Sequence, residues 1–186
     1  MNNVVVIYKS KYGTTKQYAE LIAQALEAPI FEASKVKPSR LLSYDVVVYG
    51  GCLYAGRIGG IELVAKNPCK LLVVFTVGIA NPDITDYSVI LKKNFAPDLL
   101  STTKVFHLRG GINYKKLGII HKGMMVMLKK TMANKAETEL SSDDKAILET
   151  SGGKADFTDK NTIEPIVEFV KGNVEWEKSC GQSYKE

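Results

Sequence analysis

Apolar and polar positions alternate in blocks along the chain, and these blocks predict strands and helices in turn. Four short runs are made almost entirely of apolar residues, which is typical of strands buried on both faces of a parallel sheet. They are Val4–Tyr8, Val46–Tyr49, Leu71–Phe75 and Val105–Leu108. Residues 29–33 are a fifth and weaker candidate, so the pattern predicts five strands.

Segments with apolar residues at helical spacing lie between and after these runs. They predict helices from near Thr15 to Leu26 and over Ile61–Lys66, Tyr87–Phe95, Lys115–Met132, Asp143–Leu148 and Thr162–Val170. Strands alternating with helices indicate an α/β fold, a three-layer sandwich with helices on both faces of a parallel sheet. Five strands in a chain of this length favour the sheet order 2-1-3-4-5.

Composition indicates one domain in a reducing compartment. The chain has 186 residues, and no linker-like stretch divides it. We expect a domain over residues 1–171 and a mobile tail over 172–186, which has little to bury beyond Trp176. Three scattered cysteines and two histidines argue against a disulfide framework and a metal site. Without a signal peptide or a membrane-spanning run, a cytoplasmic location is expected.

The segment after the first strand has the composition of a phosphate-binding turn. A strand that turns through small and hydroxylic residues into a helix presents unpaired N–H groups at the positive end of the helix dipole. Hydroxyl groups add donors, and a glycine lets the backbone approach a phosphate closely. The residues are Ser10, Lys11, Tyr12, Gly13, Thr14 and Thr15. The alternative is an ordinary helix start after a surface turn.

Two further glycine-containing segments follow the third and fourth predicted strands. Their backbone groups are expected to meet a planar ring, and Tyr54 is expected to lie against its face. The second segment is Gly51, Cys52, Leu53, Tyr54, Ala55 and Gly56, and the third is Thr76, Val77, Gly78, Ile79, Ala80 and Asn81. Either segment alone is explained by glycine at a strand end. Three such segments at one edge of a sheet favour a binding site.

These features resemble the flavodoxin superfamily over about residues 4–171. The first segment is similar to the S/T-x-x-G-x-T loop of that family, which holds the phosphate of FMN. More narrowly, Gly50–Gly56, Leu108–Tyr114 and Ser151–Asp156 resemble the branch of flavodoxin-like, quinone-dependent protoporphyrinogen oxidases. The resemblance implies that Ser10–Thr15 binds the FMN phosphate and that the other two segments flank the isoalloxazine ring. No catalytic acid or base is assigned.

Charge is unevenly distributed along the chain. The formal net charge is +5, and no acidic residue lies between Asp98 and Glu137. The amphipathic, methionine-rich segment Lys115–Lys130 is interpreted as a packing helix or as a surface for an anionic membrane. A peripheral position at the inner face of the membrane is therefore one expectation. The basic block lacks interleaved aromatic residues, so no nucleic-acid partner is favoured.

The sequence leaves three functions open. The first is an FMN-binding redox protein that exchanges electrons with a partner protein or a small molecule, a quinone being one candidate. The second is the quinone-dependent oxidation of protoporphyrinogen IX in heme biosynthesis. The third is a non-catalytic binding module with the same fold. Physiological substrate, electron donor and acceptor are not determined by the motifs.

Overall fold

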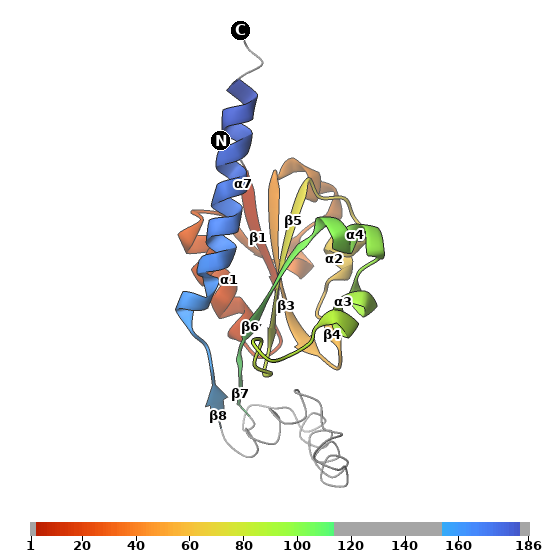
Figure 1. The fold of residues 1–186 in the computed structure, drawn as a ribbon, viewed down its shortest axis with the longest axis vertical. Coiled ribbons are helices and arrows are strands. Elements are labelled where there is room, and N and C mark those ends of the chain that lie inside the picture. Colours follow the sequence, from red (N-terminus) through yellow and green to blue (C-terminus); the bar gives the residue numbers. More distant parts are fainter. Residues whose placement is uncertain (1–2, 114–153, 183–186) are drawn as a thin grey trace.

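The computed structural model describes residues 3–113 and 154–182. Its middle layer is a sheet of five parallel strands in the order β2-β1-β3-β5-β6 (Figure 1). Counted among these five strands alone, this is the predicted order 2-1-3-4-5, which is confirmed. The strands are β1 (Val4–Lys9), β2 (Ile30–Glu32), β3 (Val46–Tyr54), β5 (Leu71–Gly78) and β6 (Lys104–Arg109).

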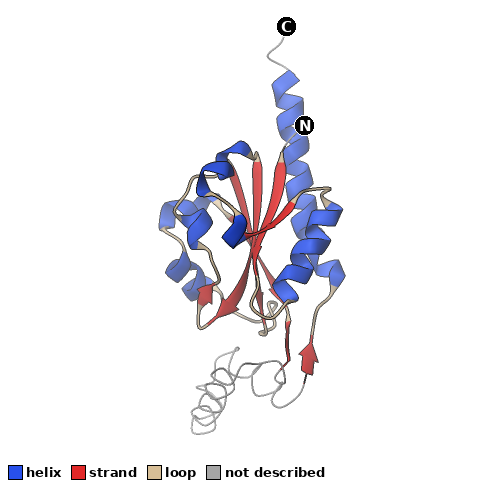
Figure 2. Ribbon diagram, turned by 180° about the vertical axis from the view of Figure 1, so that it is seen from behind, coloured by secondary structure: helices blue, strands red, loops and turns tan. Residues whose placement is uncertain are grey.

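Helices cover both faces of the sheet, as the alternating pattern predicts (Figure 2). On one face lie α1 (Thr14–Ala25) and α7 (Glu164–Gln182). On the other lie α2 (Glu62–Ala65), α3 (Ser88–Asn94) and α4 (Pro97–Thr102). Short 3₁₀ turns are η1 (Ala33–Lys35), η2 (Pro38–Ser43) and η5 (Lys160–Ile163). Among the described residues, no helix is both long and apolar enough to cross a bilayer.

The core is split into two halves by the sheet, because successive side chains of a strand point to opposite faces. Val6 packs with Tyr18 of α1 and Ile166 of α7, and each is fully buried. Its neighbours Val5 and Ile7 point to the other half, which also contains residues of η2, α2 and α3. The strands are therefore apolar on both faces, which explains their unbroken runs of valine, isoleucine and leucine.

Several elements differ from the sequence-based expectation. β3 continues to Tyr54 and β5 to Gly78, although the apolar runs predicted ends at Tyr49 and Phe75. Here pairing with neighbouring strands extends the ladder past the purely apolar runs, into residues that include glycine and threonine. α4 was not predicted, because a six-residue helix beginning with proline has too few positions to show a period.

The final helix is also longer than expected. It was predicted to end at Val170, before Gly172, whereas α7 runs to Gln182 and extends past the sheet (Figure 1). A glycine inside a helix costs only about 1 kcal/mol relative to alanine, so it does not stop a helix that is anchored by burial. Ile166 and Val170 supply that anchor and are fully buried, as predicted.

Three very short strands had no signal in the sequence. β4 (Arg57–Ile58) pairs with β3 in an antiparallel hairpin, and β7 (Gly111–Asn113) pairs with β8 (Lys154–Asp156). The second pair brings together the two ends of the segment 114–153. The helices predicted at Lys115–Met132 and Asp143–Leu148 lie in that segment, outside the described residues.

Candidate functional site

The three segments predicted to form one site follow adjacent strands. β1 pairs Lys9 with Gly51 of β3, and β3 pairs Gly51 with Thr76 of β5. Since the three strands are parallel, their carboxyl ends lie at the same edge of the sheet. The strand order reverses between β1 and β3, and open parallel sheets bind ligands at the carboxyl edge beside that point. The structure therefore brings the three segments together where a ligand is expected.

The first segment forms a tight turn into α1. The Ser10 hydroxyl oxygen accepts a hydrogen bond from the Gly13 N–H at 3.1 Å. Gly13 has φ of 100°, which an L-residue rarely adopts, so glycine is required for this turn. α1 begins at Thr14 without a side-chain cap. The N–H groups of its first turn therefore have no acceptor within the helix and point toward the edge of the sheet.

The second segment is mainly strand rather than loop, which corrects the expectation. Residues up to Tyr54 belong to β3, and Ala55 and Gly56 form the two-residue turn into β4. Both turn residues have positive φ, as in the mirror-image turns that join twisted antiparallel strands. A Cβ atom on Gly51 would overlap the Ile58 side chain. Gly51 is thus explained by packing, whether or not a ligand also contacts it.

Lys11 and Tyr54 meet across the gap between the first and second segments. The Lys11 ammonium lies 3.3 Å from the centroid of the Tyr54 ring and 5.6 Å from that of Tyr12. A cation over a tyrosine face is attracted by the electron density of the ring. Tyr54, which was expected to stack on a flavin, therefore presents a face covered by Lys11.

Cys52 lies on the same strand end as Tyr54 and is half-buried. Burial raises the pKa of its thiol, and the nearby Lys11 only partly opposes this effect. The thiol is therefore neutral at ordinary pH, which favours a packing role over a reactive one.

The third segment begins inside β5, which is a second correction. Thr76 is fully buried and its hydroxyl lies 2.6 Å from Nδ1 of His107 on β6. Its hydroxyl is therefore engaged with the neighbouring strand, away from solvent. Gly78 ends the strand, and Ile79, Ala80 and Asn81 form the loop that follows. Only these last residues extend beyond the sheet as predicted.

Arg109 holds this third loop in place, a role that the motif analysis did not assign. Its Nε donates to the carbonyl oxygen of Ile79 at 3.0 Å, and its guanidinium lies 3.7 Å from the centroid of the Phe157 ring. The Arg109 carbonyl accepts a hydrogen bond from the Tyr18 hydroxyl at 2.8 Å. These partners are far apart in the sequence, so no local pattern could have indicated the arrangement.

The comparisons with known proteins agree with this architecture. A family model described as a flavodoxin domain matches residues 5–141. The chain belongs to the flavodoxin domain family. No curated protein matches it significantly. The narrower protoporphyrinogen oxidase resemblance is not decided by the family match.

Solved structures similar to this flavodoxin-family chain share little sequence with it. The Flv1 flavodiiron core from Synechocystis sp. PCC6803 has 17% identity and a TM-score of 0.43, over 57% of this chain and 30% of that chain. Flavodoxin 2 from Bacillus cereus also has 17% identity and a TM-score of 0.43, over 57% and 84%. A flavoprotein in complex with FMN from Lactobacillus acidophilus NCFM has 11% identity and a TM-score of 0.41, over 59% and 93%.

The donors of the first segment fit the phosphate of a nucleotide. The uncapped first turn of α1 supplies backbone N–H groups, and the hydroxyl of Ser10 adds a side-chain donor that already contacts Gly13. Among the described side chains, the carboxylate closest in sequence to this turn is Glu20, and it pairs with Lys16 at 3.6 Å. The donor set and its charge therefore suit an anion in this flavodoxin-family domain.

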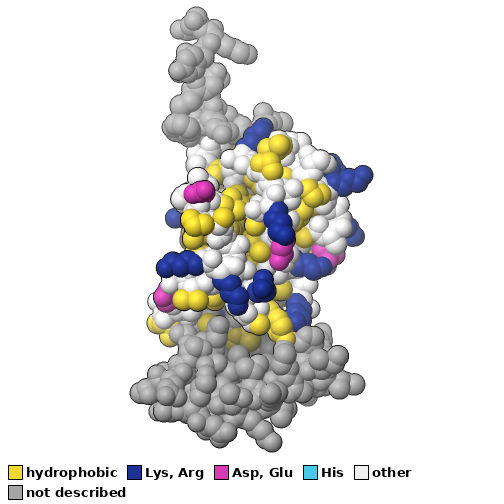
Figure 3. All heavy atoms as spheres, turned by 90° about the vertical axis from the view of Figure 1, so that its right-hand side faces the viewer, with side chains coloured by type: hydrophobic (Ala, Val, Ile, Leu, Met, Phe, Trp, Pro, Cys, Tyr) yellow, Lys and Arg dark blue, Asp and Glu magenta, His cyan; other side chains and the backbone are white. Residues whose placement is uncertain are grey.

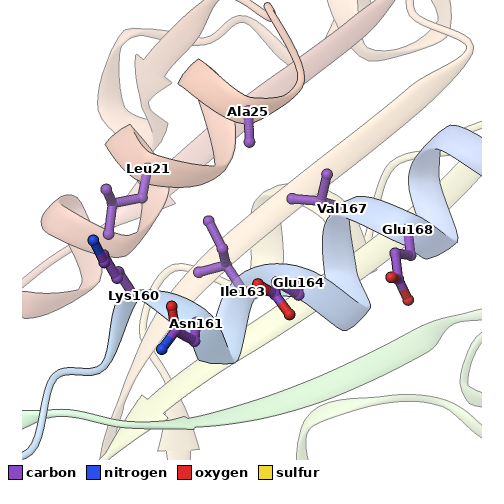
Figure 4. Close-up of a pocket in the computed structure, with 8 residues that line it drawn as sticks. All are labelled: Leu21, Ala25, Lys160, Asn161, Ile163, Glu164, Val167 and Glu168. Carbon is purple, nitrogen blue, oxygen red and sulfur yellow. The ribbon is translucent and has the colours of Figure 1, made fainter.

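A shallow pocket of about 280 Å³ lies elsewhere in the domain, between α1 and the start of α7 (Figure 4). Its apolar lining comes from Leu21 and Ala25 on α1 and from Ile163 and Val167 opposite them. None of its lining residues belongs to the three segments. Among the described residues, no cluster of histidine, cysteine and carboxylate side chains could hold a metal ion.

Proposed function

We propose that the chain binds FMN non-covalently at the carboxyl edge of its sheet and uses it for electron transfer. The observation that carries the proposal is the convergence of the uncapped start of α1 with the ends of β3 and β5 in a member of the flavodoxin domain family. Bound FMN would supply an isoalloxazine ring that accepts and returns electrons.

Each segment has a part in this proposal. Ser10 and the N–H groups at the start of α1 hold the phosphate, with Gly13 shaping the turn. The end of β3 and the loop after β5 enclose the ring, and Arg109 fixes that loop through the carbonyl of Ile79. No residue is assigned as a proton donor or acceptor.

A matched pair of substitutions tests the phosphate site. Gly13→Asp and Gly13→Asn impose a similar backbone strain at φ of 100°, but only aspartate adds a negative charge. We expect the purified wild-type protein to show flavin absorption after gel filtration with FMN. We expect Gly13→Asp to weaken FMN binding at least about tenfold more than Gly13→Asn, because the aspartate carboxylate repels the phosphate.

The outcomes separate an FMN-binding protein from a non-catalytic module. If the wild-type protein shows no flavin absorption after gel filtration with FMN, the proposal is contradicted and a non-catalytic module remains. Equal FMN binding by the two Gly13 variants would contradict the placement of the phosphate at the start of α1. Riboflavin, which lacks the phosphate, is the control ligand, and its binding is expected to be the same for the two variants.

The narrower hypothesis of quinone-dependent porphyrinogen oxidation remains a proposal carried by sequence resemblance alone. Two of the segments behind it, Leu108–Tyr114 and Ser151–Asp156, lie partly outside the described residues. It is tested by mixing FMN-loaded protein with protoporphyrinogen IX and a quinone and following porphyrin fluorescence. Porphyrin formation no faster than with free FMN would rule it out.

An anionic redox partner is a further part of the proposal. Lysine and arginine side chains are spread over the face that carries α2, α3 and α4, including its lower part (Figure 3). Arg57, Lys92 and Lys93 are exposed there, and the Lys93 ammonium lies beside Gly56 at the turn between β3 and β4. A partner with acidic groups near its own redox centre would be attracted to this face.

A further inference from the structure

We propose that Lys11 tunes the redox balance of the bound flavin by placing its ammonium group against the reduced ring. The inference rests on the proposed function, because it concerns the ring that the chain is proposed to bind. It assigns Lys11 to the ring, whereas the family resemblance assigns the whole segment Ser10–Thr15 to the phosphate.

Lys11 is exposed, and its ammonium lies over the Tyr54 ring at the edge of the sheet where the flavin ring is proposed to bind. Lys11 follows β1, and Tyr54 ends β3, so the two residues lie on either side of the point where the strand order reverses. The ammonium is 3.3 Å from the Tyr54 ring centroid, with Tyr12 on a second side at 5.6 Å. Its charge also acts on Cys52, lowering the pKa of the thiol against the effect of burial.

Three other cations near this edge are engaged with different groups. Lys9 pairs with Glu32 at 3.2 Å, and Lys16 pairs with Glu20. Arg109 is bound to the Ile79 carbonyl and to the Phe157 ring. Within the described part of the chain, no carboxylate forms an ion pair with Lys11. Its charge is therefore not offset by an ion pair within the described residues and is available to a ligand at this edge.

Reduction of the ring changes its charge, and Lys11 acts on that change. Two electrons from a reductant such as dithionite, and one proton taken up at N5, convert the neutral oxidised ring into a ring with one negative charge. An ammonium group beside the ring would stabilise the charged ring more than the neutral one. The reduced flavin is therefore bound more tightly, relative to the oxidised flavin, than it would be without Lys11.

The measurement is the ratio of the dissociation constants of FMN in the oxidised and reduced states, obtained anaerobically with dithionite as reductant. Lys11→Met is expected to lower this preference for reduced FMN about tenfold, which is a shift of about 30 mV for a two-electron couple. Lys11→Arg keeps the charge and is expected to keep the preference. Changes in stacking on Tyr54 affect both states and largely cancel in the ratio.

Lys16→Met is the matched control, because it removes a lysine near the same turn that is already paired with Glu20. Its ratio is expected to equal that of the wild type. Thermal unfolding confirms that each variant is folded; the exposed position of Lys11 makes a loss of fold unexpected.

Each outcome bears on one of the two proposals. A wild-type protein that binds no FMN contradicts the proposed function. FMN binding with an unchanged ratio in Lys11→Met overturns the inference about Lys11 alone. Weaker binding of FMN but not of riboflavin, equal in both redox states, also overturns it, because Lys11 would then serve the phosphate.

Discussion

His107 shows at the scale of one residue how packing changes side-chain chemistry. It lies inside the predicted strand Val105–Leu108. In the structure it stacks on Tyr87, with ring centroids 3.6 Å apart and an angle of 6° between the rings, and contacts Thr76. Burial lowers its pKa from 6.5 to about 4.

The lowered pKa of His107 predicts a loss of stability in acid. Between pH 6.5 and about 4 the unfolded chain binds a proton at this residue and the folded chain does not. The free energy of unfolding is therefore expected to fall as the pH falls through this window. Urea unfolding at pH 7 and pH 4.5 measures the difference. His107→Gln, which does not titrate, should lose less stability, and an equal loss would contradict the prediction.

The glycines near the candidate site have structural roles that the sequence did not separate from ligand binding. Gly13 and Gly56 are needed for positive φ, whereas Gly50 and Gly51 leave room for side chains of the neighbouring strands β5 and β4. The three-segment pattern selected residues that the structure brings to one edge of the sheet. It could not assign a reason to each glycine, because the crowding comes from residues distant in sequence, such as Phe75 and Ile58.

At the scale of elements, the close contact of β3 with β5 is tested by a pair of glycine substitutions. A Cβ atom on Gly50 would overlap the Phe75 ring, whereas a Cβ atom on Gly172 in α7 would meet nothing within 4 Å. Gly50→Ala is expected to lower the free energy of unfolding by about 1–3 kcal/mol. Gly172→Ala is expected to raise it by up to about 1 kcal/mol. Urea denaturation followed by circular dichroism measures both.

The opposite signs of the two changes distinguish packing from intrinsic propensity. If Gly50→Ala were neutral, the sheet would have room that the structure does not show. If Gly172→Ala were destabilising, the helical interior around residue 172 would differ from the observed α7.

The elements themselves were predictable to different degrees. The amphipathic helices α1 and α3 were found close to their observed bounds, because packing on one face leaves a period in the sequence. The apolar runs gave the starts of β3 and β5 but not their ends. β4, β7, β8 and α4 were missed, because elements of two to six residues contain too few positions to show one.

At the scale of the whole molecule, the sheet joins two apolar halves into one cooperative unit. α7 belongs to the half that contains α1, although almost the whole chain separates the two helices. Ile166 is fully buried in that half, and Glu168 on the same helix is exposed.

This long-range packing predicts a large effect at Ile166. Ile166→Ala is expected to lower the free energy of unfolding by about 2–5 kcal/mol, because it leaves a cavity between α7 and the sheet. Glu168→Ala should change it by less than about 0.5 kcal/mol. Chemical denaturation is expected to show one transition in each case. A separate early transition in Ile166→Ala would mean that α7 unfolds independently of the sheet.

The sequence by itself determined the fold class, the strand order and the edge of the sheet at which a ligand is expected. Hydrophobic periodicity reports which face of each element is buried, and the order of elements limits how a parallel sheet is connected. Only the tertiary structure decided that Thr76 is buried against His107, that Arg109 secures the third loop and that Lys11 covers Tyr54. Those contacts join residues that are far apart in the chain, and such contacts leave no periodic trace in the sequence.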